Sequence, residues 1–414
     1  MLKSLSASLL LSLALAACIS ATPTPPGAVT APLPTLDVTA PPPTLTSATT
    51  TPLPPTPTGA VTAPLPTAPL APTATPPGRL GPENLPANVN PLTGEVVGDT
   101  AALDHRPLAV KIVNAPPCAR PQFGLNQAAL VFEHYVEAWS TRFTAIFYGH
   151  EAAKIGGVRS ARLIDLELPA IFDALLVTSG SSGGVKERLV NSDFAPRIVS
   201  AEFGVDCPPL CRVPLESVPC HTPEHTLFTT SRDLHAAAVS AGLEQRPQLS
   251  GWAFSAAPLA PGGSATRLRV DYLNAPVDWT YDSPSGNYLR SQNGTRQVDA
   301  LDKQRLTAAN VVVVFAHHLY SDIRESTNFY SLEIQFWGQG PARVFRDGQA
   351  FEGIWLRPQR AGLFQLVDAL GAVIPLKPGR TWFEFVALDS TVEMREGAWT
   401  ITAAILPEQT PPKP

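Results

Sequence analysis

The sequence predicts an α+β protein in which a mixed α+β domain (79–250) is followed by a mainly antiparallel β domain (251–405). Charged and aromatic residues are scarce before residue 79 and common after it, which marks the start of the folded part. Helical and strand patterns then alternate as far as about residue 245, whereas later segments show mostly period-two alternation separated by glycine-containing turns. A Pro/Thr-rich tether (19–78) is expected to be disordered ahead of both domains.

The first 18 residues have the pattern of an export signal. Lys3 supplies a short positive region, and residues 5–15 form an apolar run that is shorter than the roughly 20 residues of a transmembrane helix. The run ends in Leu15-Ala16-Ala17-Cys18, which resembles the lipobox of exported bacterial lipoproteins. The resemblance implies a lipid on Cys18 and a location on the outer face of the bacterial cell membrane. A plain secretory signal is the alternative.

The tether has an unusually simple composition. It is dominated by Pro, Thr, Ala and Ser, and Asp37 is its only charged residue. The unit GAVTAPLPT occurs at 27–35 and again at 59–67, which makes this a duplicated low-complexity segment. Without aromatic residues it cannot bury enough apolar surface to offset its ordering entropy. In an extended polyproline conformation, at about 3.1 Å per residue, it would hold the folded part up to roughly 180 Å from the membrane.

Charge and hydropathy restrict the classes of partner. The formal net charge is −5, so the chain lacks the overall basic character of a nucleic-acid-binding protein. No second apolar run is long enough to span a membrane, and we expect membrane contact through the lipid on Cys18. The folded part is too long for one ordinary core, which predicts the two domains, and 406–414 are expected to be a frayed tail.

In the first predicted domain, β-rich runs at 130–137 and 141–148 flank Ala138-Trp139-Ser140, which predicts an antiparallel hairpin. Thr230 or Ser231 is a candidate N-cap of a helix that reaches residue 241. The other predicted elements are strands at 108–113 and 174–178, a helical turn at 125–129 and a helix at 162–172.

In the second predicted domain, alternating strands begin at Arg267 and Val277. The run VVVVF at 311–315 is typical of a buried central strand. The segment 331–355 is interpreted as consecutive strands of a meander, and PLKPGRTWFEFV at 375–386 as a turn followed by a closing strand.

These segments resemble the YerB-like family of bacterial lipoproteins. The first domain carries the resemblance at 106–147 and in KIGGVRSAR at 154–162, and the second carries it at 281–294, 340–358 and 374–386. The resemblance implies an exported, membrane-anchored protein with two domains, and it implies no particular reaction. The long tether and a cysteine-rich insert at 205–222 depart from the family pattern.

A group of charged residues close in sequence is the main candidate site. Guanidinium groups present planar forks of donors that suit carboxylates and phosphates. Two arginines follow a Gly-Gly turn, where the backbone can approach an anion closely. The alternative is that these arginines pair internally with Glu133, Glu137 or Asp165. The predicted ligand-binding set is Arg120, Arg142, Arg159, Ser160, Arg162, Glu133 and Glu137.

Four cysteines remain besides Cys18, and in an exported chain they predict disulfides of unspecified connectivity. They are Cys118, Cys207, Cys211 and Cys220. The competing interpretation is a zinc site, because His221 and His225 lie close to three of them. Prolines in the insert and the exported location favour disulfides, and we expect no metal and no cofactor.

The evidence for catalysis is weak. The run TSGSSGG at 178–184 misses the G-x-S-x-G spacing of a hydrolase elbow, and no histidine is selected as a base by its spacing. The leading hypothesis is therefore a binding or scaffolding module of the cell envelope, which recognises an anionic glycan, a phosphate-bearing polymer or a partner protein. The alternatives are a hydrolase or transferase with its site in a cleft between the domains, and a purely structural lipoprotein.

Overall fold

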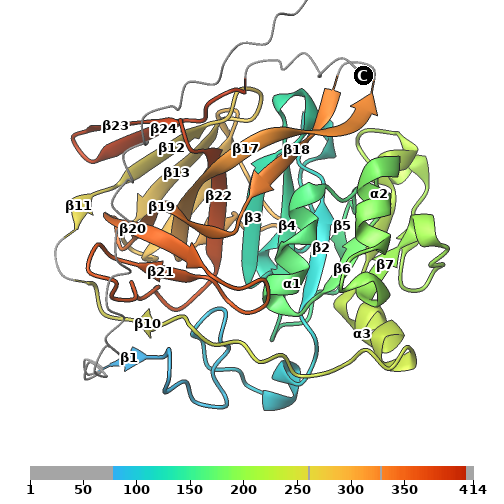
Figure 1. The fold of residues 1–414 in the computed structure, drawn as a ribbon, viewed down its shortest axis with the longest axis horizontal. Helices are drawn as coiled ribbons and strands as arrows, with labels where there is room; N and C mark the ends of the chain where they lie inside the picture. The colour runs from blue at the N-terminus through green and yellow to red at the C-terminus, as the bar shows by residue number, and fades with distance from the viewer. Residues whose placement is uncertain (1–77, 260–261, 327–328, 407–414) are drawn as a thin grey trace, which may run out of the picture. The chain divides into compact units, whose positions relative to one another are not determined.

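The computed structural model describes residues 78–259, 262–326 and 329–406, all of which belong to one compact unit. The predicted signal peptide, Cys18, the tether up to residue 77 and the tail from residue 407 lie outside the described residues. Strands dominate the described part, and its helices are short (Figure 1). The α+β prediction is therefore correct only in a coarse sense.

The described helices all lie between residues 100 and 240. The α-helices are α1 (Leu168–Phe172), α2 (Gly183–Val190) and α3 (Ser231–Ser240). The 3-10 helices are η1 (Thr100–Leu103), η2 (Pro117–Ala119), η3 (Leu125–Gln127), η4 (Glu137–Trp139), η5 (Leu163–Leu166), η6 (Ala195–Arg197), η7 (Ala201–Phe203), η8 (Leu215–Ser217) and η9 (Pro223–His225).

The largest sheet takes strands from both halves of the chain. Its order is β11-β20-β19-β17-β22-β3-β4-β2-β6-β7, with β18 paired to β17 and β21 paired to β20. The strands are β2 (Leu108–Ile112), β3 (Leu130–Tyr135), β4 (Thr141–Phe147), β6 (Leu175–Thr178), β7 (Ile198–Ser200), β11 (Gly263–Ser264), β17 (Asn310–Ser326), β18 (Phe329–Gln335), β19 (Gly338–Arg346), β20 (Gln349–Arg357), β21 (Gln365–Val367) and β22 (Thr381–Ala387).

Strand β22 joins the two halves. It pairs in parallel with β17 on one side and with β3 on the other, and all seven of its residues are buried (Figure 1). The predicted closing strand is therefore a central strand, and its neighbours come from segments far away in the sequence. The predicted meander is also only partly correct, because β18 pairs with the distal part of β17 rather than with β19.

Three smaller sheets complete the fold. A seven-stranded sheet contains β12 (Arg267–Asp271), β13 (Val277–Asp282), β14 (Asn287–Gln292), β15 (Thr295–Arg296), β16 (Thr307–Ala308), β23 (Thr391–Arg395) and β24 (Ala398–Thr402). A three-stranded sheet contains β5 (Ile155–Gly156), β8 (Cys211–Arg212) and β9 (Leu227–Thr229). A two-stranded sheet pairs β1 (Arg79–Leu80) with β10 (Phe254–Ser255).

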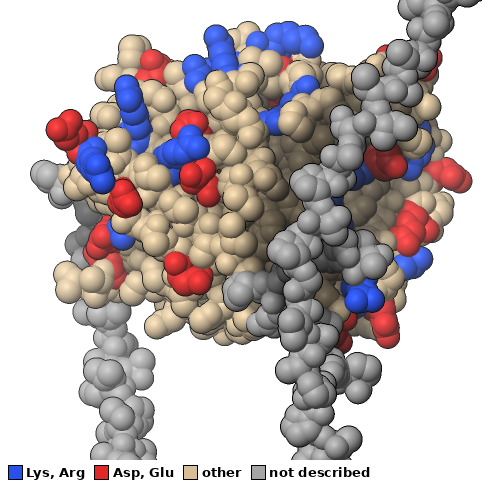
Figure 2. Space-filling view, turned by 90° about the horizontal axis from the view of Figure 1, so that it is seen from above, with Lys and Arg blue, Asp and Glu red and all other residues tan. Residues whose placement is uncertain are grey.

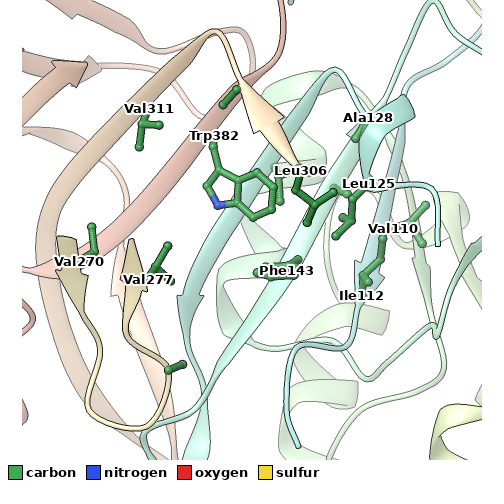
Figure 3. Packing of buried hydrophobic residues seen from close by; sticks show 14 of the residues in the cluster. Val110, Ile112, Leu125, Ala128, Phe143, Val270, Val277, Leu306, Val311 and Trp382 are labelled. Atoms are coloured by element: carbon green, nitrogen blue, oxygen red, sulfur yellow. The ribbon is translucent and has the colours of Figure 1, made fainter. Parts of the chain in front are cut away.

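Each face of the large sheet packs into its own core, because successive residues of a strand point to opposite faces. On one face Trp382 of β22 lies near Phe143 of β4, and Val270 and Val277 of the seven-stranded sheet belong to the same cluster (Figure 3). On the other face Phe383 of β22 stacks on Phe132 of β3, with ring centroids 4.6 Å apart.

Several local predictions are confirmed. The hairpin at 130–148 forms as β3 and β4. Thr230 caps α3, because its side chain accepts a hydrogen bond from the Asp233 N–H. The helix expected at 162–172 is divided into η5 and α1, and Pro169 stands in the first turn of α1, where a missing N–H costs little.

Candidate functional site

The candidate site lies where several parallel strands of the large sheet end. Strands β22, β3, β2, β6 and β7 run in the same direction, with β4 antiparallel between β3 and β2. In open sheets of this kind, ligands commonly bind at the carboxyl ends of the strands. Figure 2 views the molecule from this side and shows Lys and Arg side chains beside a hollowed area.

The segment 159–161 is fixed to the ends of two of these strands. The N–H of Arg159 donates to the Lys111 carbonyl of β2 at 3.0 Å, and the N–H of Ser179, which follows β6, donates to the Arg159 carbonyl at 3.0 Å. The Ala161 N–H donates to the hydroxyl of Thr178 at 2.9 Å. The backbone that carries the predicted arginines is thus positioned by the sheet.

Arg162 forms an internal ion pair with Glu137, which was the alternative to ligand binding. Its Nε and a terminal nitrogen donate to the two carboxylate oxygens of Glu137, each at 2.6 Å. Burial raises the pKa of Glu137, but the charge and hydrogen bonds of Arg162 outweigh it, and the net pKa is lowered. Arg162 and Glu137 therefore hold η4 against the loop before η5.

A second cationic group is also neutralised internally. Lys111 of β2 is fully buried, and its Nζ lies 2.8 Å from Asp165 Oδ2 and 2.8 Å from the hydroxyl of Thr144. It also contacts His134 Nε2 at 2.7 Å. Because His134 Nδ1 lies 2.9 Å from the Tyr135 carbonyl, Nδ1 carries the hydrogen and Nε2 accepts from Lys111. Burial, opposed by Asp165, lowers the pKa of Lys111 to about 8.

Arg142, at the start of β4, has no such partner. The residue is 8 % exposed, and its guanidinium donates to the Ser160 carbonyl at 2.9 Å. The two carboxylates whose charges act on it, Glu137 and Asp165, already pair with Arg162 and Lys111. Within the described residues, no carboxylate oxygen lies within ion-pair distance of Arg142. Burial and the charge of Arg162 lower the pKa of Arg142 well below its usual value.

Arg159 and His225 lie close enough to Arg142 to interact with it electrostatically, and each has a buried nitrogen without a hydrogen-bond partner in the described part of the chain. Arg159 donates to the Glu224 carbonyl at 3.2 Å, and its buried Nε has no partner within the described residues. His225 of η9 is 8 % exposed, and its Nδ1 lies 2.7 Å from the Thr222 hydroxyl, while its buried Nε2 likewise lacks a partner there. Burial and the charge of Arg159 lower the pKa of His225. We call Arg142, Arg159 and His225 the anion site.

The serine-rich loop between β6 and α2 is engaged by carboxylates. The Ser181 N–H donates to Glu202 at 2.9 Å, and the Ser182 hydroxyl donates to Glu325 at 2.7 Å. Lys186 of α2 pairs with Glu202 at 3.2 Å. In the hydrogen bonds of the described chain, no histidine contacts a serine of this loop.

The second half of the chain reaches this region through an arm made of β18 and the distal part of β17. Arg188 of α2 pairs with Asp322 of the arm at 3.1 Å. A Cβ atom on Gly184 would lie 2.8 Å from side-chain atoms of Ile323, so the arm packs closely on α2. Residues of both halves thus surround the loop that precedes α2.

The structure divides the predicted ligand-binding set. Arg120 donates to Asn293 at 3.1 Å and lines a cavity of about 370 Å³ whose lining includes no residue of the anion site. Arg142 pairs with His134 in the hairpin register, so the neighbouring Glu133 points to the opposite face of the sheet. Ser160 contributes its backbone carbonyl to Arg142, and its hydroxyl lies 3.5 Å from that of Ser179.

Glu133 belongs to a buried network that the sequence analysis missed. It pairs with Arg290 of β14, and both side chains are fully buried. The guanidinium of Arg290 also lies over the ring of Trp382, 4.7 Å from its centroid. Glu384 of β22 accepts a hydrogen bond from Trp279 at 2.9 Å, and burial together with the charge of Glu133 raises its pKa well above the usual range. A carboxylate in the middle of the apolar run TWFEFV was the available signal.

The four described cysteines form two pairs at disulfide distance. Cys118 pairs with Cys220, and Cys207 pairs with Cys211. The first pair connects η2 to the segment that leads into η9, which carries His225. The second closes a short loop within the insert. The alternative zinc site would need these same sulfur atoms as ligands, and in this arrangement they are paired with one another.

The fold and the site define a class of protein in which two halves of one chain form a single large sheet. Residues of both halves lie around a cationic site at one end of that sheet. Residues 92–244 match the family described as "Protein of unknown function (DUF3048) N-terminal domain", and residues 268–383 match its C-terminal domain. The chain belongs to this DUF3048 family.

Similarity to a Bacillus subtilis protein, in sequence and in structure, supports the assignment. The chain is 29 % identical over 300 residues to a Bacillus subtilis (strain 168) protein named "Putative lipoprotein YerB", across 72 % of this chain and 85 % of the relative. It also superposes on a crystal structure of YerB from Bacillus subtilis with a TM-score of 0.59 and 26 % identity, covering 72 % of this chain and 96 % of that one. The family resemblance predicted from the sequence is confirmed. Among the described helices, none has the length and hydropathy to span a bilayer.

Proposed function

We propose that this protein is a lipid-anchored binding module of the bacterial envelope and that its anion site holds a phosphate or carboxylate group of an envelope glycan or polymer. The location rests on the lipobox pattern at Cys18 and on similarity to a relative whose name describes a lipoprotein. The binding role rests on the arginines and histidine at the carboxyl ends of the parallel strands.

The observation that carries the proposal is the incomplete neutralisation of Arg142. A buried charge is costly unless an opposite charge and hydrogen bonds compensate it. Among the described residues Arg142 has one hydrogen-bond acceptor, the Ser160 carbonyl, and the neighbouring carboxylates are engaged by other cations. A bound anion would supply the missing charge and acceptors.

The neighbouring donors fit the same ligand chemistry. The Nε atom of Arg159 and the Nε2 atom of His225 lack partners in the described part of the chain, and they add two donor positions when the imidazole carries its hydrogen on Nε2. Guanidinium groups match the oxygens of phosphate and carboxylate in pairs, and such charge-assisted hydrogen bonds are stronger than neutral ones. Arg162 keeps η4 in place and is a positioning residue in this proposal.

The test compares Arg142→Met with Arg162→Met in the full-length protein. Inorganic phosphate, a poly(glycerol phosphate) chain and a muropeptide serve as probes, and melting temperature and calorimetric binding are measured. We expect at least one probe to bind the wild type, and Arg142→Met to weaken that binding by about 10- to 100-fold. The unliganded Arg142→Met protein should be at least as stable as the wild type, because a buried unpaired charge has been removed.

Arg162→Met should behave in the opposite way. Removing this arginine leaves Glu137 without its partner, so we expect a loss of roughly 3 kcal/mol in unfolding free energy. Arg188→Met, on the exposed side of α2, is the matched control and should change neither property strongly. If no probe binds the wild type and Arg142→Met melts early, the arginines are purely structural. Binding that is unchanged in Arg142→Met would place the ligand elsewhere.

A further inference from the structure

A cluster of nitrogen and oxygen donors lies near the start of β2, at the opposite end of that strand from the anion site. His105 follows η1, His235 lies on α3, and Glu244 comes after the end of α3. The Nδ1 atoms of His105 and His235 lie 3.2 Å and 2.6 Å from the same atom, Glu244 Oε1. One ligand atom of each residue falls within 4.8 Å of the other two.

Contacts outside the cluster orient its carboxylate. The second oxygen of Glu244 accepts a hydrogen bond from the Arg106 N–H at 2.7 Å. The side chain of Arg106 donates to the Leu243 carbonyl at 2.8 Å and pairs with Asp173. Because these bonds fix one oxygen and the adjoining backbone, the other oxygen is directed toward both imidazoles. Such outer contacts are a regular feature of metal sites, where they orient the ligands.

The separations between Glu244 and the two imidazoles are close to those around a small divalent ion. Bonds of about 2.0–2.1 Å in a tetrahedral zinc site place the ligand atoms about 3.3 Å from one another. The separation of 3.2 Å between His105 and Glu244 already matches this value. The separation of 2.6 Å between His235 and Glu244 would have to increase by about 0.7 Å, which a rotation of the imidazole on α3 can supply.

The cluster is also accessible. The side chains of His105, His235 and Glu244 are 40 %, 15 % and 14 % exposed. The two histidines line a cavity of about 380 Å³, which Asp99, His150 and Glu151 also line. An ion held by three protein ligands would therefore keep a coordination position for water or for a ligand entering this cavity.

We propose that His105, His235 and Glu244 bind one divalent transition-metal ion, with Zn²⁺ as the preferred ion. Two imidazoles and one carboxylate are a common ligand set for zinc sites that keep an open position. From the sequence a metal site was considered only at the cysteine-rich insert, since His105 and His235 are separated by 130 positions and form no spacing motif. The same contacts would otherwise serve as a hydrogen-bonded clip between η1 and the end of α3.

The test is zinc binding by the full-length protein, measured by equilibrium dialysis with elemental analysis and by calorimetric competition with a chelator. We expect one ion per chain in the wild type. His105→Ala, which removes the most exposed ligand, and Glu244→Gln, which retains an acceptor for the Arg106 N–H, should each weaken binding by at least about tenfold. His317→Ala is the matched control, because it removes an exposed histidine from β17.

Stability provides an independent measurement. Zinc should raise the melting temperature of the wild type and of His317→Ala, because an ion that binds only the folded state stabilises it. It should leave the melting temperature of His105→Ala/Glu244→Gln nearly unchanged. The proposal is overturned if the wild type retains no stoichiometric zinc, or if the double variant binds zinc as tightly as His317→Ala does.

Discussion

Substitution of Arg290 tests whether the buried charges of the large sheet connect the two halves of the fold. Arg290 comes from the seven-stranded sheet, whereas its partner Glu133 comes from β3, and neither side chain is exposed. Arg290→Met would leave Glu133 buried with hydrogen bonds from Thr141 at 2.6 Å and Asn114 at 3.1 Å but without a counter-charge. It would also remove the cation that lies over Trp382.

The expected loss of unfolding free energy can be bounded from these contacts. Breaking a buried ion pair by removing one partner typically costs about 3–5 kcal/mol. The retained hydrogen bonds to Glu133 and the similar volume of methionine place Arg290→Met near the lower end, at about 3 kcal/mol. Arg290→Met/Glu133→Gln removes both charges and should recover at least half of that loss, although the contact of the guanidinium with Trp382 is still missing.

Urea unfolding at pH 7, followed by tryptophan fluorescence, measures these differences. Arg269→Met is the matched control, because Arg269 pairs with Asp271 and Asp278 on an exposed part of β12 and is 39 % exposed. The control should lose less than about 1 kcal/mol. The reasoning is refuted if Arg290→Met costs no more than Arg269→Met, or if the double variant is as unstable as the single one.

Two further predictions concern β22 and the arm. Because the pKa of Glu384 is raised in the folded protein, stability should fall as pH rises from about 4.3 toward that raised pKa, by up to about 1.4 kcal/mol per pH unit. Glu384→Gln should remove this dependence, and urea unfolding at several pH values would contradict the idea if both proteins showed the same slope. Gly184→Ala should destabilise the protein by about 1–3 kcal/mol, because its methyl group meets Ile323, whereas Gly183→Ala, with open space around it, should be neutral or slightly stabilising. Equal melting temperatures of these two glycine variants would show that the arm does not pack on α2 as described.

Local structure in the first half could be predicted from the sequence because its signals are local. The hairpin of β3 and β4 has alternating β-rich runs around a short connection, and α3 has a threonine cap and a glycine after its end. Helix α2 was missed, since its first two residues, Gly183 and Gly184, belong to the Gly/Ser run at 178–184. Glycine has low helix propensity, and here tertiary contacts with the arm override it.

Long-range pairing could not be predicted in this way. Nothing in the residues of β22 specifies parallel neighbours from two distant segments, because a fully buried strand has the same apolar pattern in either direction. The candidate site shows the same limit. Arg162 and Glu137 are close in sequence and were considered as a pair, whereas the proximity of His225 depends on how η9 folds back. Glu133 was grouped with the arginines although strand alternation places it on the other face.

The position of β22 late in the chain delays completion of the large sheet during synthesis. Strand β3 cannot pair with β22 until that strand, which lies about 250 residues later in the chain, has been synthesised. At about 5–20 residues per second, roughly 13–50 s of synthesis separate the two strands. Throughout that interval one edge of β3 offers unpaired N–H and C=O groups, the kind of edge that recruits other chains. A first half produced alone would retain this open edge, because the strand that pairs with it, β22, lies in the second half of the chain.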